Sequence, residues 1–249
     1  MKKNILIGTH HKTGTVWLGS VFRVFAKLMN IEFYNISKSY IDPDEKKNLF
    51  KHINEFNSKA IYFDHHSKFP DIPIKNKHLF KGIHIIRDPK DVLISGTLYH
   101  AWSEEKWLHI PQDKFNGMTY QEKINAFDNI EDKIEFEMNY SSKNTIKSMV
   151  NFKTKNIYLN IKFETLMIDK YFDEVMNIAK HLELEGEEII FLFRAFYNES
   201  LFGKKGNVKK KHIQPKVKKD EYKDILELIL IDKFNDEFGY DRFELGYTV

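Results

Sequence analysis

The stretch that decides the fold is NILIGTHHKTGTVW, at residues 4–17. Its first part, Asn4–Gly8, is a short apolar run of the kind that forms a buried strand. Beyond Gly14, apolar residues recur every three or four positions from Leu18 to Leu28, which predicts a helix with one buried face. A buried strand that runs through a glycine-containing loop into a helix is typical of α/β proteins.

The same alternation continues along the chain. Further strands are predicted at 60–63, 83–86 and 157–163, and helical spacing of apolar residues recurs at 172–182, 189–196 and 226–234. Strands that alternate with helices predict a three-layer α/β fold, with a central parallel sheet and helices on both of its faces. We expect an irregular excursion from the sheet at 103–120 and a long basic loop at 203–219.

Composition narrows the class of protein. The 249 residues are 42% hydrophobic and 30% charged, with a mean hydropathy of −0.50, which is too apolar for a disordered chain and too polar for an integral membrane protein. No stretch reaches the roughly 18 apolar residues of a membrane span. The absence of cysteine excludes disulfides, thiolate catalysis and cysteine-ligated zinc, and we expect a cytoplasmic protein. Because the net charge is only +3, any anion site must be local.

The loop after the first predicted strand has the chemistry of an anion site. A loop in this position presents main-chain N–H groups and the positive end of a helix. Gly14 allows a tight turn, and Lys12 adds a cation beside the hydroxyl groups of two threonines. The segment is not the nucleotide triphosphatase loop, in which lysine follows the second glycine, and it lacks the GxGxxG fingerprint. An ordinary strand-to-helix turn that contains a lysine is the alternative interpretation.

A second candidate anion site lies at residues 83–95, IHIIRDPKDVLIS. Asp88 is suited to cap the helix that follows, and Arg87 ends the preceding strand. Open α/β sheets bind ligands at the carboxyl ends of their strands, so Arg87 could hold an anion together with the hydroxyl of Ser95. Alternatively, Arg87 forms a structural salt bridge with Asp88 or Asp91.

Taken together, the two motifs resemble the cofactor signatures of the sulfotransferases that use 3′-phosphoadenosine-5′-phosphosulfate (PAPS). The family's loop for the 5′-phosphosulfate stands here as KTGTVW at 12–17, and its segment for the 3′-phosphate stands at 87–95. Lys204-Lys205-Gly206 is similar to the family's Arg-Lys-Gly element, and Phe163-Glu164 to its Tyr-Glu pair. The resemblance implies a single sulfotransferase domain over residues 1–249, with a P-loop-like nucleotide-binding architecture.

The resemblance also implies which residues bind the cofactor. They are Lys12, Thr13, Gly14, Thr15, Val16, Trp17, Arg87, Ser95, Phe196, Lys204, Lys205 and Gly206. Trp17 and Phe196 would stack on adenine, although aromatic residues at helical spacing are more often part of the core. Three positions depart from the family pattern: Val16 lacks a hydroxyl group, Lys204 lacks the fork of an arginine, and Phe163 lacks the hydroxyl of a tyrosine.

The implied reaction is in-line transfer of a sulfuryl group from PAPS to a hydroxyl or amine, which leaves 3′-phosphoadenosine-5′-phosphate (PAP). Lys12 would neutralise the charge that builds on the leaving phosphate, and no metal is needed. The family's usual base is a histidine just after a central strand; His66 fits this place, with Asp64 as an orienting carboxylate. His65 or a glutamate could take that role instead, and the histidines at 10–11 could contact the substrate.

Two other functions fit parts of the sequence. A small-molecule kinase with an atypical phosphate loop would need Mg²⁺ and an acidic residue to hold it. A non-catalytic polyanion-binding module would work through the basic loop at 203–219, but would leave both loop motifs unexplained. For the sulfotransferase, we expect a small-molecule or glycan acceptor and no nucleic-acid partner. Tyr99, Trp102, Trp107 and His109 could line the acceptor pocket or pack onto the core, and the sequence defines neither the acceptor nor the oligomeric state.

Overall fold

The structure is a computed structural model that describes residues 1–36, 53, 59–69, 76–152, 157–199 and 216–248. Its contacts divide the chain into two compact units. The first consists of Met1–Arg87 and Phe152–Lys210, and the second of Asp88–Asn151 and Lys211–Val249. The expectation of one domain over the whole chain stays a prediction.

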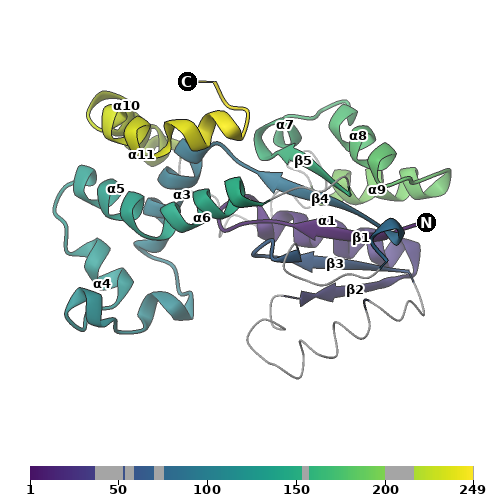
Figure 1. Cartoon of the computed structure of the whole chain (residues 1–249), viewed down its shortest axis with the longest axis horizontal. Coiled ribbons are helices and arrows are strands. Elements are labelled where there is room, and N and C mark those ends of the chain that lie inside the picture. Colours follow the sequence, from purple (N-terminus) through teal and green to yellow (C-terminus); the bar gives the residue numbers. More distant parts are fainter. Residues whose placement is uncertain (37–52, 54–58, 70–75, 153–156, 200–215, 249) are drawn as a thin grey trace. The chain divides into compact units, whose positions relative to one another are not determined.

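A five-stranded parallel sheet forms the centre of the first unit (Figure 1). Its strands are β1 (Asn4–Gly8), β2 (Glu32–Asn35), β3 (Ala60–Asp64), β4 (Phe80–Ile86) and β5 (Tyr158–Lys162). They lie in the order β2-β3-β1-β4-β5, and each neighbouring pair is parallel. β1 and β3 are buried along their whole length, as expected for a parallel sheet that is covered on both faces. The predicted α/β fold, a central parallel sheet with helices around it, is therefore confirmed.

Alternate residues of the central strands enter two separate cores, because successive side chains point to opposite faces of a sheet. Among the described residues, the helices of this unit include α1 (Thr15–Met29), α7 (Phe163–Met167), α8 (Asp173–His181) and α9 (Glu187–Glu199), with a short 3-10 helix, η3, at Lys77–Leu79. Ile5 and Ile7 of β1 pack in one cluster with α1, α8 and α9. Leu6, between them, packs in the other cluster with Tyr62 and Phe80. The buried strand and the amphipathic helix of residues 4–28 thus build the first core together.

Two features of the sheet differ from the sequence prediction. The strand predicted at 157–163 ends at Lys162, and Phe163 instead begins α7. The sequence does not predict β2, whose four residues are partly or fully exposed and form no apolar run. β2 lies at the edge of the sheet, where Phe33 and Tyr34 pack against the two cores but are only partly covered.

The second unit is helical in the part that the structure describes (Figure 1). Its helices are α3 (Pro89–His100), α4 (Tyr120–Asn125), α5 (Ile130–Asn139), α6 (Ser141–Asn151), α10 (Lys216–Leu228) and α11 (Ile231–Glu244). The irregular excursion expected at 103–120 is confirmed. It contains the 3-10 helices η4 (Lys106–His109) and η5 (Asp113–Phe115) and an isolated bridge between Pro111 and Thr119.

Two expectations for the C-terminal part of the chain are wrong. The basic loop predicted at 203–219 ends earlier, because residues 216–219 already belong to α10; the rest of that loop lies outside the described residues. The apolar spacing at 226–234 covers the end of α10 and the start of α11 rather than one helix. Leu226 and Phe234 are both buried but belong to different helices, so a single apolar pattern continues across a helix break.

A buried carboxylate joins four helices of the second unit. Glu137 of α5 is fully buried, and its Oε2 accepts hydrogen bonds from His100 of α3 (2.9 Å) and Tyr120 of α4 (2.8 Å). Its Oε1 accepts one from Ser142 of α6 (2.8 Å). Burial favours the neutral acid, but the charge and hydrogen bond of His100 and the two hydroxyl groups outweigh burial and lower the pKa of Glu137. The helices therefore meet at a carboxylate whose oxygens are matched by donors.

Candidate functional site

The anion loop, residues 9–14 between β1 and α1, is folded around the carbonyl oxygen of His10. That oxygen accepts hydrogen bonds from the main-chain N–H of Thr13 (3.2 Å), the hydroxyl of Thr13 (2.9 Å) and the hydroxyl of Thr15 (2.8 Å). The N–H of Thr9 donates to the carbonyl oxygen of Asp64 at the end of β3 (2.9 Å), which fixes where the loop leaves the sheet. The threonine hydroxyls thus hold the loop together, and their contact with a ligand stays a prediction.

Two residues of the anion loop have left-handed backbone conformations. Lys12 has a φ of 64° and Gly14 a φ of 89°. A Cβ atom at Gly14 would lie 2.4 Å from Cε2 of Phe163, so both the conformation and the available space require glycine. Gly14 is also the N-cap of α1, and the first turn of that helix contains no acidic residue. The N–H groups of this turn therefore form a positive helix terminus suited to an anion.

The side chain of Arg87, which follows β4, lies against the anion loop. Its Nη1 donates a hydrogen bond to the carbonyl oxygen of Lys12 (2.6 Å), and its guanidinium carbon lies 5.0 Å from the ring centroid of Phe163. The register pairs Gly8 of β1 with His84 of β4, so both strands end at the same edge of the sheet. The first motif and the cation of the second motif are therefore brought together.

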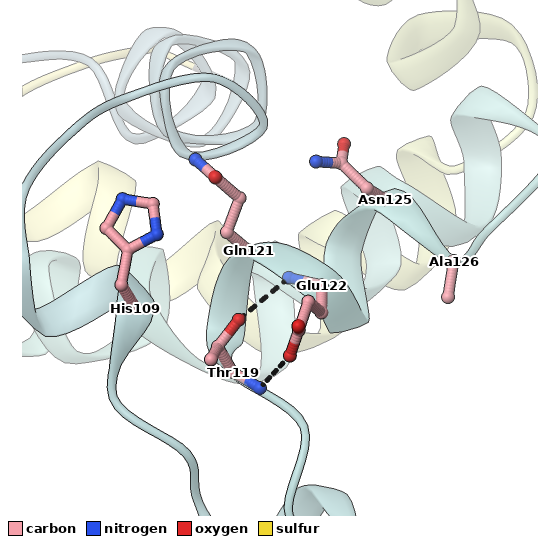
Figure 2. A pocket seen from close by; sticks show the side chains of 6 residues that line it. All are labelled: His109, Thr119, Gln121, Glu122, Asn125 and Ala126. Atoms are coloured by element: carbon pink, nitrogen blue, oxygen red, sulfur yellow. Dashed lines mark hydrogen bonds between the residues drawn. The ribbon is translucent and has the colours of Figure 1, made fainter.

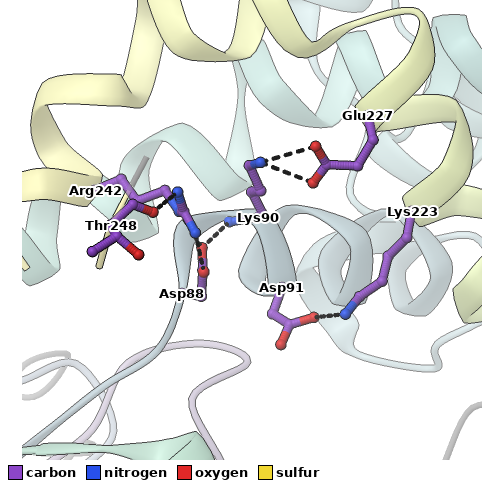
Figure 3. Close-up of polar contacts among 7 residues, drawn as sticks. All are labelled: Asp88, Lys90, Asp91, Lys223, Glu227, Arg242 and Thr248. Atoms are coloured by element: carbon purple, nitrogen blue, oxygen red, sulfur yellow. Dashed lines mark hydrogen bonds and ion pairs between the residues drawn. The ribbon is translucent and has the colours of Figure 1, made fainter. Parts of the chain in front are cut away.

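Asp88 caps α3 and is anchored by α11 (Figure 3). Its Oδ1 accepts a hydrogen bond from the N–H of Lys90 (2.9 Å), which confirms the predicted N-cap. Nε and Nη2 of Arg242 donate to the two carboxylate oxygens of Asp88, at 3.0 and 2.9 Å, and Nη1 donates to the carbonyl oxygen of Thr248. Nζ of Lys90 binds both carboxylate oxygens of Glu227 in α10, at 2.8 and 3.1 Å. Hydrogen bonds and ion pairs thus connect both α10 and α11 to the first residues of α3.

Asp91, in the first turn of α3, forms further ion pairs with α10. Its Oδ1 lies 3.2 Å from Nζ of Lys223 (Figure 3). It also lies 3.0 Å from Nζ of Lys219, and both lysines belong to α10. Asp88 and Asp91 therefore each bind a cation of the C-terminal helices. Ser95 lies in the middle of α3 with its side chain partly exposed, so it is not sealed in the core.

The two aromatic residues predicted to stack on adenine differ in exposure. Phe196 of α9 is 3% exposed and packs in the core against Trp17, with the ring centroids 5.9 Å apart. Its ring presents almost no surface to a ligand, which favours the core role that was the alternative for this residue. Trp17 is half-buried; its Nε1 donates to the carbonyl oxygen of Glu199 (2.9 Å), and its ring meets Phe163 edge to face. Val16, in the first turn of α1, is 58% exposed.

The two histidines after β3 have different surroundings. His66 is exposed, and its main-chain N–H donates to Oδ1 of Asp64 (2.9 Å). The other oxygen of this buried carboxylate accepts the N–H of Lys68 (2.6 Å), so Asp64 shapes the turn that carries His66. Nε2 of His65 lies 3.2 Å from the amide nitrogen of Asn35, and burial, followed by the nearby His66, lowers the pKa of His65. His66 is therefore the more accessible of the two.

The structure also contains a buried pair of histidines that the sequence analysis missed. His10 is 2% exposed and His84 is 1% exposed, and their Nε2 atoms are 2.7 Å apart. Burial lowers the pKa of His84 to about 4 and holds the pKa of His10 well below its ordinary value. His10 is therefore not open to a substrate, which corrects that expectation. A polar residue inside the apolar strand predicted at 83–86 was the signal that could have revealed His84.

The residues predicted to line an acceptor pocket make varied contacts in the second unit. The Tyr99 hydroxyl and Nε1 of Trp107 donate to the two carboxylate oxygens of Glu105, at 3.0 and 2.7 Å. Trp102 is 48% exposed and meets Tyr99 edge to face. His109 lies at the end of η4, where Nε2 is 3.2 Å from the carbonyl oxygen at position 103. Their role in binding an acceptor stays a prediction.

His109 also lines a hollow of about 590 Å³ in the second unit (Figure 2). The lining residues are His109, Thr119, Gln121, Glu122, Asn125 and Ala126. Thr119 and Glu122 bind each other through both hydrogen bonds of a capping box at the start of α4, so their polar groups serve that helix. None of the lining residues belongs to either anion motif.

Three of the residues predicted to bind the cofactor, Lys204, Lys205 and Gly206, lie outside the described residues. Within the described part of the chain, no group of three or more His, Cys, Asp or Glu side chains could hold a metal ion. In the same part of the chain, no helix has the length and apolar character needed to cross a membrane.

The chain belongs to the sulfotransferase domain family, whose model matches residues 2–225. Among solved structures, it is similar to the mouse sulfotransferase SULT7A1 complexed with PAP, with a TM-score of 0.56 and 15% sequence identity. That alignment covers 98% of this chain and 87% of the mouse chain. A comparison with curated proteins found no match. The family predicted from the two loop motifs is therefore confirmed.

Proposed function

We propose that this protein transfers a sulfuryl group from PAPS to a hydroxyl or amine acceptor and releases PAP. One observation carries the proposal: the guanidinium of Arg87 is hydrogen-bonded to the carbonyl oxygen of Lys12 (2.6 Å), in the loop that leads into the N-terminus of α1. A guanidinium, an ammonium group and helix N–H groups together suit a ligand with several negative charges. The family of the chain, and the PAP bound to the similar mouse enzyme, support the choice of nucleotide.

Each anion motif then holds one end of the nucleotide. Residues 12–16 and the N–H groups at the start of α1 hold the 5′-phosphosulfate, and Val16 contributes its main chain only. The family resemblance assigns Arg87 and Ser95 to the 3′-phosphate, together with residues 204–206. Trp17 rather than Phe196 lines the adenine, because Phe196 is buried in the core.

The chemistry requires charge stabilisation and one proton acceptor. Lys12 and the helix N–H groups stabilise the negative charge that develops on the bridging oxygen when the bond between that oxygen and sulfur breaks. His66 takes the proton that the acceptor loses as its oxygen or nitrogen attacks sulfur in line. His66 suits this role better than His65, whose ring is partly buried beside Asn35. A small-molecule or glycan acceptor and a cytoplasmic location belong to the same proposal.

Thermal unfolding with PAP, and separately with ATP and Mg²⁺, tests the proposal. PAP at about 100 times its Kd should stabilise the folded chain by about 2.7 kcal/mol, which raises Tm by roughly 5–11 °C for a protein of this size. A shift with ATP and Mg²⁺ alone would instead identify a kinase. Salt-sensitive binding of heparin without either shift would identify a polyanion-binding module.

Single variants locate the site. Lys12→Ala should abolish sulfuryl transfer and most of the PAP-dependent shift while the protein remains folded. Lys27→Ala changes an exposed lysine in the last turn of α1 and is the matched control, which should keep the full shift. A Lys12→Ala protein that PAP stabilises as much as the unmodified chain would contradict the proposal. His66→Ala should lower kcat more than PAP affinity; full activity would move the base to His65 or to a glutamate.

A further inference from the structure

Three polar side chains from neighbouring parts of the sheet are joined by hydrogen bonds in a series that ends in the anion loop. His10 follows β1, His84 lies in β4, and Asn160 lies opposite His84 in β5. Nε2 of His10 is 2.7 Å from Nε2 of His84, and Nδ1 of His84 is 2.9 Å from Oδ1 of Asn160. The ring of His84 also stacks on Phe152, with the centroids 3.8 Å apart. Each ring is therefore held in one orientation.

These contacts define which ring nitrogens carry hydrogen. Because Asn160 offers its carbonyl oxygen, Nδ1 of His84 donates and Nε2 of His84 is left as an acceptor. Nε2 of His10 must then carry the hydrogen between the two rings. Both rings are neutral imidazoles in this arrangement, which agrees with the lowered pKa of each.

The main chain of His10 is the centre of the anion loop. Its carbonyl oxygen accepts the three hydrogen bonds from Thr13 and Thr15, and its N–H lies 2.9 Å from the hydroxyl oxygen of Thr13. Two residues further on, the carbonyl oxygen of Lys12 accepts the hydrogen bond from Nη1 of Arg87. A displacement of the His10 ring would therefore move the residues that surround the proposed phosphosulfate site.

We propose that His84 and Asn160 are positioning residues that act through His10 to set the geometry of the anion loop, and with it the affinity for the nucleotide. This inference rests on the proposed function. His10 and His84 are almost completely buried, so neither ring can serve as the base for an acceptor. An apolar residue at position 84 would leave the buried N–H of His10 without its acceptor, which is the physical reason for a histidine there.

The test measures PAP affinity by calorimetry on the full-length protein and compares variants of the His10–His84–Asn160 hydrogen bonds. His84→Leu and Asn160→Leu break the link, whereas the amide in His84→Gln can still accept from His10 and donate to Asn160. We expect the two leucine variants to weaken PAP binding about tenfold and to raise KM for PAPS more than they lower kcat. His84→Gln should restore most of the affinity. His181→Leu, at a half-buried histidine of α8, is the matched control and should bind PAP as the unmodified chain does.

Equal PAP affinity in the unmodified chain and in both leucine variants would overturn the inference. If His84→Leu does not fold, Asn160→Leu decides alone, because Asn160 is exposed and its replacement disturbs the core less than a change at the buried His84. If the unmodified chain binds no PAP, the proposed function fails, and NMR without nucleotide judges the positioning role separately. In that case the amide resonances of Thr13 and Gly14 should shift in Asn160→Leu, and unshifted resonances would reject the role.

Discussion

Gly14→Ala should destabilise the protein through two separate effects. The φ of Gly14 is 89°, and an alanine held in the left-handed region costs about 1–2 kcal/mol. The added Cβ would also lie 2.4 Å from Cε2 and 2.7 Å from Cδ2 of Phe163, so the ring or the loop must move, at a cost of about 1–3 kcal/mol. We therefore expect the free energy of unfolding to fall by about 2–5 kcal/mol.

The same substitution should disturb the anion site, because Phe163 also supports Arg87. The guanidinium carbon of Arg87 lies 5.0 Å from the centroid of that ring. A ring pushed away from position 14 would take this support with it, so the folded Gly14→Ala protein should bind PAP more weakly. In a double-mutant cycle with Phe163→Ala, the clash should be measured as a coupling of about 1–3 kcal/mol.

Gly117→Ala is the matched control for the clash. Gly117 has a φ of 83°, close to that of Gly14, but an added Cβ there would meet nothing within 4 Å. Urea unfolding should therefore show a loss of only about 1–2 kcal/mol for Gly117→Ala, from the conformation alone. If Gly14→Ala costs no more than this control, the contact between position 14 and Phe163 does not restrict the loop, and the reasoning is refuted.

Three further predictions concern buried charged or titratable groups, each measured by urea unfolding. The pKa of His84 is about 4 in the folded chain and about 6.5 in the unfolded chain, so between these pH values the unfolded state binds one more proton. The free energy of unfolding should therefore reach its full value above about pH 6.5 and fall by about 1.4 kcal/mol per pH unit towards pH 4. The slope should be smaller in His84→Leu. Arg242→Ala should cost about 1–3 kcal/mol, because it removes the two guanidinium donors from the largely buried carboxylate of Asp88 and leaves only the N–H of Lys90; a loss below about 0.5 kcal/mol would mean that solvent screens the pair. Tyr120→Phe should cost about 1–3 kcal/mol at neutral pH, because buried Glu137 loses one donor, and unchanged stability would mean that this carboxyl group is not ionised.

The central strands could be predicted from the sequence because burial on both faces leaves an apolar run. β1 and β3 show such runs, and their predicted positions agree with the structure to within a residue. β2 could not be predicted in this way, since four partly exposed residues at the edge of a sheet need no apolar run. The break between α10 and α11 was missed for a different reason: Leu226 and Phe234 are buried at helical spacing although they lie in two helices.

The residues of the anion site could be predicted, but their contacts could not. Arg87 is recognisable as a cation at the end of a strand, yet its partner is a carbonyl oxygen of Lys12, 75 residues away. Lys12 also has a positive φ, which propensity does not predict for a lysine. The pairing of His84 with His10 likewise depends on the register of β4 against β1, which sets His84 beside Gly8.

Arg87 and Asp88 are consecutive in the sequence but are bound by different parts of the chain. Arg87 donates to the anion loop, whereas Asp88 binds Arg242 of α11 through both carboxylate oxygens. Asp91 is held in the same way by two lysines of α10. The hydrogen bond of Arg87 to Lys12 thus lies in the first unit, and the ion pairs of the two acids lie in the second. Neighbouring residues of one sequence motif therefore need not act as one structural group: the helix cap at Asp88 belongs to the second unit, and the contact of Arg87 with the loop belongs to the first.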